Sequence, residues 1–128
     1  MPAIPLRTAL ILDAVASGAT GLLAIVASGF LGWLLDLPPG LLLGAGLVLV
    51  PYVLFVIYTA TRHPIPSGAV RTIVAANFLW AAASVLLLLS GWVAPNALGV
   101  AFVLAQAAVV ALFGQLQVMA LRQPLATA

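Results

Sequence analysis

The sequence predicts an all-α fold, an integral membrane four-helix bundle in which residues 1–128 form a single four-span transmembrane domain. Of its 128 residues, 66% are hydrophobic and only 5% are charged, whereas a soluble domain has about a quarter charged residues. A soluble globule of this size needs polar cover that four arginines and two aspartates cannot supply. Its leucine runs also lack the alternation of membrane β-barrel strands.

Four apolar stretches are long enough to cross a bilayer, which takes about 20 helical residues. The predicted helices cover residues 7–34, 40–61, 68–91 and 96–121. Each break between them contains proline, which lacks an amide donor and restricts the residue before it. Ser67 and Asn96 have the side chains that cap helix N-termini, so we expect them to be the N-cap residues of the third and fourth helices.

The positive charges predict the orientation of the chain. They lie before the first helix, around the second loop and after the fourth helix, at Arg7, Arg62, Arg71 and Arg122. Short cytoplasmic loops retain arginine, so both termini are expected in the cytoplasm. Trp33 and Trp92 lie near the other loops, as expected for interfacial anchors. Without a recognisable eukaryotic targeting signal, a bacterial inner membrane is the expected location.

The two halves of the chain resemble each other at an offset of 64 residues. The informative matches are Arg7-Thr8 with Arg71-Thr72, Asp13 with Asn77, and Thr20 with Ser84. They favour two tandem helical hairpins related by a pseudo-twofold axis along the membrane normal. Chance matching in a chain rich in leucine and alanine is the other interpretation.

Asp13 is the only ionisable side chain well inside an apolar run, and such residues are commonly functional. Burial favours its neutral form, whereas a nearby Arg7 favours the carboxylate, and the sequence leaves both open. Hydroxyl and amide groups at helical spacing extend this polar set, because lipid cannot hydrogen-bond them. The candidate intramembrane site comprises Asp13, Ser17, Thr20, Asn77, Ser84, Gln106 and Gln117.

These polar residues have three interpretations. They can be interhelical hydrogen-bonding groups that stabilise packing. Alternatively, Asp13 and Asn77 face each other and bind a cation, a proton or a polar group of a substrate. In the third, Asp13 reaches the lipid headgroups near Arg7 or Arg71.

Several kinds of chemistry are not expected. The chain has no cysteine and a single histidine, His63, in a loop, so no metal site, cofactor or catalytic triad is predicted. Its arginines are scattered, which argues against nucleic-acid binding. Small residues four apart allow close helix packing, at Ala14/Gly18, Ser17/Gly21, Ser28/Gly32 and Gly40/Gly44.

Asp13 is similar in type to the acidic residue in the first helix of small multidrug-resistance exporters. Those proteins are shorter, use glutamate and carry further motifs that this sequence lacks. Fluoride channels of similar length carry a Thr/Ser-Phe motif where this chain reads Asn77-Phe78-Leu79. The sequence is therefore assigned to neither family.

Two functions remain. The first is a non-enzymatic scaffold, accessory or helix-packing subunit in the lipid bilayer, associating with itself or with a membrane protein partner. The alternative is an oligomeric small transporter or channel that uses Asp13 with Asn77.

Overall fold

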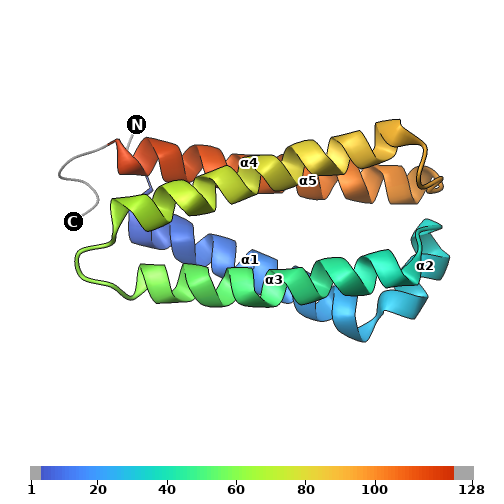
Figure 1. The fold of residues 1–128 in the computed structure, drawn as a ribbon, viewed down its shortest axis with the longest axis horizontal. Coiled ribbons are helices and arrows are strands. Elements are labelled where there is room, and N and C mark those ends of the chain that lie inside the picture. The colour runs from blue at the N-terminus through green and yellow to red at the C-terminus, as the bar shows by residue number, and fades with distance from the viewer. Residues whose placement is uncertain (1–3, 123–128) are drawn as a thin grey trace.

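The apolar stretches form helices in the computed structural model, which describes residues 4–122. The helices are α1 (Leu6–Val26), α2 (Ser28–Leu35), α3 (Pro39–Ala60), α4 (Ser67–Ser90) and α5 (Ala97–Leu121) (Figure 1). All but α2 are long and apolar enough to span a membrane. The predicted all-α class with four spanning helices is therefore confirmed.

The first predicted helix, 7–34, is wrong in one respect, because it is divided into α1 and α2. The break lies at Ala27, whose φ of −112° and ψ of 24° leave the helical region. Ser28 and Gly29 follow directly, and such Gly/Ser pairs are common sites of helix kinks. The other three helices begin and end within one residue of their predicted bounds.

The two predicted N-caps have different outcomes. The Asn96 prediction is confirmed, because its side chain accepts a hydrogen bond from the Gly99 amide at 2.8 Å. The Ser67 prediction is wrong, because Pro66 occupies the cap and Ser67 is already the first residue of α4. Proline at the cap fixes an extended backbone there without supplying a side-chain acceptor.

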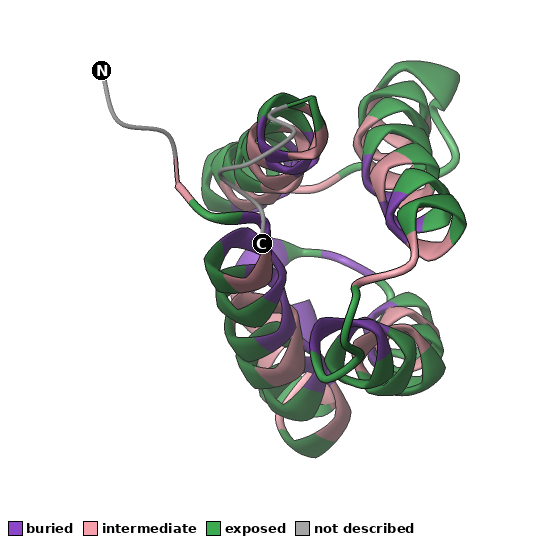
Figure 2. Ribbon diagram, turned by 90° about the vertical axis from the view of Figure 1, so that its left-hand side faces the viewer, coloured by how far each residue is buried: buried purple, intermediate pink, exposed green. Residues whose placement is uncertain are grey.

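The helices are arranged as two antiparallel pairs, α1 with α3 and α4 with α5 (Figure 1). Contacts between α1 and α5 join the pairs, whereas α3 and α4 touch at few positions. The view along the helices shows α3 and α4 apart and the buried residues directed inward (Figure 2). Large apolar side chains cover the outer faces, including Leu22, Leu54, Leu89 and Leu112, which fits a lipid bilayer environment.

Two apolar clusters close the ends of this assembly. The larger contains Leu6, Leu10, Ala14, Val56, Ala60, Val70, Ile73 and Ala120. The smaller, around the α2–α3 turn, contains Leu35, Leu37, Leu42 and Val103. The buried polar side chains and the cavities described below lie between these clusters.

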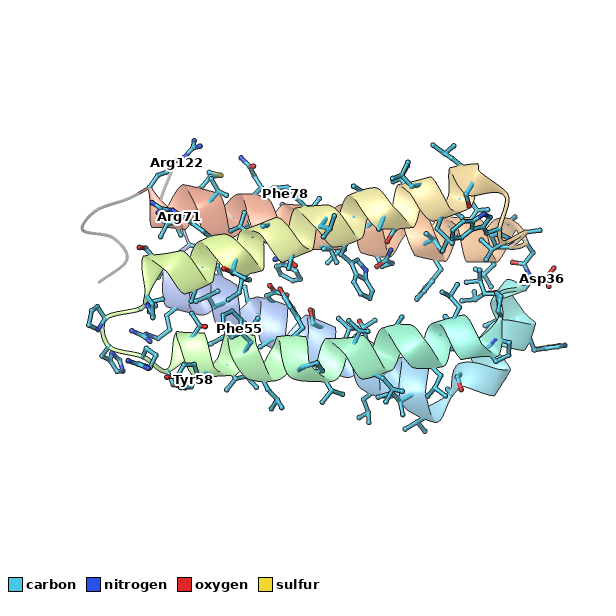
Figure 3. The ribbon with its side chains drawn as sticks, viewed as in Figure 1. Asp36, Phe55, Tyr58, Arg71, Phe78 and Arg122 are labelled. Carbon is cyan, nitrogen blue, oxygen red and sulfur yellow. The ribbon has the colours of Figure 1, made fainter. Side chains whose placement is uncertain are left out.

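All four arginines lie at the end of the larger cluster. Arg71 and Arg122 are seen there in Figure 3, with Asp36 at the opposite end. Arg7 joins the start of α1 to the end of α3, because its guanidinium donates to the Ala60 and Arg62 carbonyl oxygens. Cations stabilise the carbonyl ends of helices, so this contact strengthens the first pair.

Asn96 links the two pairs at the other end. Besides capping α5, its side-chain amide donates to the Leu34 carbonyl at 2.9 Å, and its backbone amide donates to the Leu35 carbonyl at 3.2 Å. The orphan carbonyls at the end of α2 are thereby satisfied by the segment that begins α5.

We therefore expect Asn96→Ala to lower the free energy of unfolding by about 1–2 kcal/mol, since the cap and the side-chain hydrogen bond to the Leu34 carbonyl are both lost. Asn96→Ser keeps a capping hydroxyl but cannot reach Leu34, so its loss should be intermediate. Unfolding in mixed detergent micelles measures both values. Equal stability of all three proteins would contradict the linking role.

Candidate functional site

Asp13 receives hydrogen bonds from each of the other spanning helices. Its Oδ2 accepts from the Tyr52 hydroxyl of α3 at 2.6 Å, from Asn77 Nδ2 of α4 at 3.0 Å and from Gln117 Nε2 of α5 at 2.8 Å. Its Oδ1 accepts from the Ser17 hydroxyl, one helical turn away, at 2.9 Å. Asp13 and Gln117 have 0% exposure and Asn77 has 3%, so this polar cluster is enclosed by the bundle.

The partners of Asp13 also bond to one another. Asn77 Nδ2 donates to Gln117 Oε1 at 2.9 Å, and the Tyr52 hydroxyl lies 3.0 Å from Asn77 Oδ1. A tyrosine hydroxyl has one hydrogen, and here it has two acceptors within reach. It can turn from Asp13 to Asn77 without any movement of the helices.

Within residues 4–122, Asp13 forms no hydrogen bond or ion pair with an arginine. Its hydrogen bonds all come from uncharged groups. Arg7 is instead held at the carbonyl end of α3 and beside His63 Nδ1 at 3.1 Å. The full burial of Asp13 also contradicts the interpretation in which it reaches the lipid headgroups.

A second polar cluster lies farther along α4 and α5. Trp80 Nε1 donates to Gln106 Oε1 at 2.9 Å, and Gln106 Nε2 donates to Ser84 Oγ at 2.9 Å. Ser84 in turn donates to the Trp80 carbonyl at 2.8 Å. Ser84 and Gln106 are therefore separate from the Asp13 cluster, and Thr20 bonds only to the Ala16 carbonyl of its own helix.

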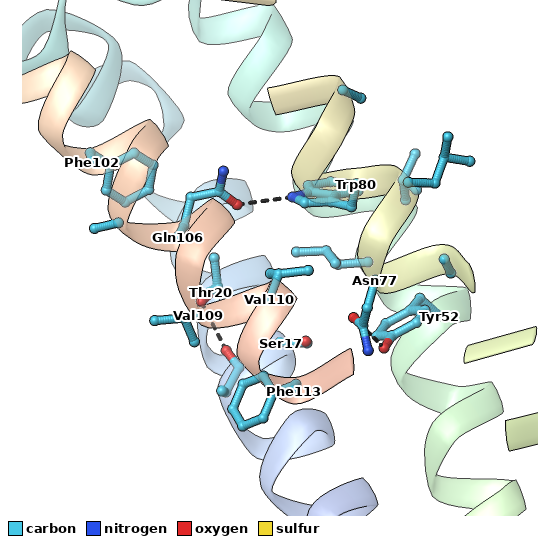
Figure 4. A pocket seen from close by; sticks show the side chains of 17 residues that line it. Ser17, Thr20, Tyr52, Asn77, Trp80, Phe102, Gln106, Val109, Val110 and Phe113 are labelled. Carbon is cyan, nitrogen blue, oxygen red and sulfur yellow. Dashed lines mark hydrogen bonds between the residues drawn. The ribbon is translucent and has the colours of Figure 1, made fainter. Parts of the chain in front are cut away.

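A cavity of about 580 Å³ lies between the two polar clusters. All four spanning helices contribute to its walls (Figure 4). Ser17, Tyr52 and Asn77 present the Asp13 cluster at one side, and Trp80 and Gln106 present the second cluster at the other. The remaining walls are mainly apolar and aromatic, and among the residues that the structure describes no charged side chain lines the cavity. Cavities of this size and character hold small organic molecules.

A smaller cavity of about 310 Å³ adjoins the first and continues toward the end closed by Leu37 and Leu42. The two share the lining residues Thr20, Leu49, Trp80, Ala83, Phe102 and Gln106. We call these two adjoining, half-open spaces the chamber; it is polar on the side of the Asp13 cluster and apolar at its far end.

Two residues of this region, Tyr52 and Trp80, were not among the predicted site residues. Both carry a polar group inside an apolar stretch, and in lipid such a group must find an internal partner. That signal was present for Tyr52, since this residue lies inside α3, eight residues before the end of the helix. It does not identify the partner, which depends on how the helices pack.

No known family model, curated protein or solved structure matches this chain. The geometry of the polar clusters and the chamber is therefore the guide to its function.

Proposed function

We propose that the chain is a small membrane transporter that takes a small molecule into the chamber beside the Asp13–Asn77 pair. The cavity of about 580 Å³ carries this proposal. Protein interiors pack densely, whereas here the side chains of the spanning helices leave a half-open space between them unfilled. A chain whose only task is helix packing gains from larger side chains at Ala76, Ala83 and Ala105, which line the cavity.

Asp13 supplies the group that can change state in this transporter. When a proton binds Oδ2, that oxygen can donate to the Tyr52 hydroxyl, whose own hydrogen then turns to Asn77 Oδ1. Both contacts already have hydrogen-bonding distances, 2.6 Å and 3.0 Å. Protonation of Asp13 thus changes the hydrogen-bonding character of the cavity wall.

The arginine end faces the cytoplasm in this proposal, with the membrane being the inner membrane of a bacterium. The reason is the retention of arginine in cytoplasmic loops. Trp33 and Trp92, at 76% and 86% exposure, then anchor the chain at the opposite interface. Self-association of the apolar outer faces completes the proposed arrangement.

A scaffold or accessory subunit without catalysis is the second candidate. One observation favours it: every buried side-chain nitrogen and oxygen atom has a hydrogen-bond partner within residues 4–122. A fully satisfied polar cluster is compatible with a static contact between helices.

Asp13→Asn separates the two candidates. The variant keeps the hydrogen bonds, because the amide oxygen can accept from Tyr52, Asn77 and Gln117 while the amide nitrogen donates to Ser17 Oγ. It can neither gain nor lose a proton at this position. We expect a folded variant whose flux falls at least about tenfold, equivalent to 1.4 kcal/mol.

The measurement is flux into proteoliposomes of protons, a monovalent cation and a fluorescent amphiphile, run in parallel with protein-free vesicles. The transporter proposal requires native flux above the protein-free rate for at least one probe and its loss in Asp13→Asn. Native flux at the protein-free rate for all three would instead favour the accessory subunit. Equal flux in both proteins would remove Asp13 from the mechanism.

A further inference from the structure

The hydrogens on the polar wall of the cavity are already committed to protein acceptors. Ser17 donates to Asp13, and Thr20 donates to the Ala16 carbonyl. Asn77 Nδ2 uses both of its hydrogens, on Asp13 and on Gln117.

The same holds for the remaining polar groups. The single Tyr52 hydrogen is shared between Asp13 and Asn77, and the Trp80 N–H donates to Gln106. Gln106 Nε2 donates to Ser84 and to the Val103 carbonyl.

What this wall offers to a ligand is therefore acceptor capacity. A hydroxyl oxygen has two lone pairs. Ser17 Oγ and Thr20 Oγ1 each act only as donors in the contacts described above. A ligand group that can only accept hydrogen bonds would face the lone pairs of these hydroxyl oxygens and find no hydrogen to bind. A group that donates would find partners without breaking any bond of the two clusters.

The shape of the chamber adds a second requirement. From the Asp13 cluster the space continues past Ala83 and Leu49 to Leu42, between walls that are mainly apolar. Asn77 and Leu87, which line opposite ends, are ten residues apart on α4 and hence about 15 Å apart along the helix axis. An extended hydrocarbon chain fits such a space, and apolar cavities exclude water and take up apolar molecules.

We infer that the chamber binds a single-chain amphiphile whose polar end is a hydrogen-bond donor, such as a long-chain alcohol. The donor lies at Ser17 and Thr20, and the hydrocarbon chain extends toward Leu42. The molecule enters from the bilayer between α3 and α4, which touch at few positions. This inference rests on the proposed function for the site and specifies its substrate class.

Trp80 gives a direct readout, because it lines both parts of the chamber. The chain has three tryptophans, so Trp33→Phe with Trp92→Phe leaves Trp80 as the only one. In nanodiscs, titration with a chain-brominated dodecanol should quench Trp80 fluorescence to saturation. The methyl ether of the same brominated chain cannot donate, and we expect its affinity to be at least about tenfold lower.

Matched alanine variants locate the binding. Ala83→Leu fills the chamber, whereas the neighbouring Ala82 does not line it. Saturable quenching should be lost in Ala83→Leu and retained in Ala82→Leu. Ala105→Leu and Ala101→Leu repeat this comparison on α5, because Ala105 lines the cavity and Ala101 does not. Circular dichroism confirms that each compared protein is folded.

Equal affinity of the alcohol and the ether would overturn the donor requirement, and equal quenching in both members of each alanine pair would overturn the location. Because this titration measures binding without transport, saturable binding with no flux in proteoliposomes would reject the transporter and retain the ligand class. Flux without saturable quenching would reject the ligand class and retain the transporter.

Discussion

Asp13→Leu is expected to lower the free energy of unfolding by about 2–4 kcal/mol, a large fraction of the stability of a small domain. The carboxylate accepts four hydrogen bonds, from Ser17, Tyr52, Asn77 and Gln117. Leucine has similar bulk but offers no acceptor, so donors on all four spanning helices lose a partner. Each unpaired buried donor costs about 1–3 kcal/mol unless it finds a substitute. Titration of the protein in lipid–detergent micelles with dodecyl sulfate measures the loss.

Asp13→Asn is the control for this prediction, because it preserves the hydrogen bonds while removing the ionisable group. Its stability should stay within about 1 kcal/mol of the native value. If leucine and asparagine were equally tolerated, the cluster would contribute little to the fold. An equally large loss in both variants would show that a carboxyl group, and not only an acceptor, is needed at Asp13.

Gly46→Leu is expected to have the second large effect, about 3 kcal/mol of destabilisation. The backbones of α1 and α3 approach closely at Gly46, where an added Cβ would lie 2.8 Å from the Gly21 carbonyl oxygen and 2.9 Å from Ile25 Cγ1. The obstacle is backbone, so the contact is relieved only if the two helices move apart. Such movement disturbs the packing of the first helical pair.

Gly44→Leu provides the matched comparison on the same helix. A Cβ at Gly44 meets nothing within 4 Å, so this variant should be no less stable than the native protein. Both variants gain the same helix propensity, because leucine is a better helix former than glycine. Unfolding of both variants in the same micelles tests the pair. The close approach would be unimportant if Gly46→Leu and Gly44→Leu unfolded together.

The architecture followed from the sequence because its signals are local. Apolar length predicted the four spanning helices, and the prolines predicted the breaks between them. The division at Ala27 was missed because the surrounding residues are as apolar as the rest of the stretch, and Ser28-Gly29 is only a short local signal for a break. The close contact of Gly21 with Gly46 was also missed as a pair, since the packing of α1 against α3 is not visible in either segment alone.

The polar site was predictable in part. Lipid offers no hydrogen bonds, so Asp13, Asn77 and Gln117 had to turn inward, and the structure brings them together. Which polar residues share a cluster depends on their position along the helix axis. Ser84 lies seven residues beyond Asn77 on α4 and bonds to Gln106 instead. The hydroxyl of Tyr52 was a visible polar group in α3, but its partnership with Asp13 depends on how α1 packs against α3.

Two residues at matched positions of the two halves are in contact in the structure, although duplication stays a prediction. Asp13 and Asn77 occupy matched positions 64 residues apart, and their side chains form a hydrogen bond with each other. Residues close to a twofold axis meet their own equivalents in this way. The segments that follow them differ, since α1 continues into α2 whereas α4 ends at Ser90.

The uneven contacts between the helical pairs determine how this protein can deform most easily. Because α1 and α5 form the main seam while α3 and α4 touch at few positions, rotation of one pair against the other about that seam disturbs the least packing. Such a rotation moves α3 away from α4 and stretches the contact between the Tyr52 hydroxyl and Asn77 Oδ1 that crosses between these two helices. The hydrogen bonds of the polar cluster therefore oppose this rotation of one helical pair against the other.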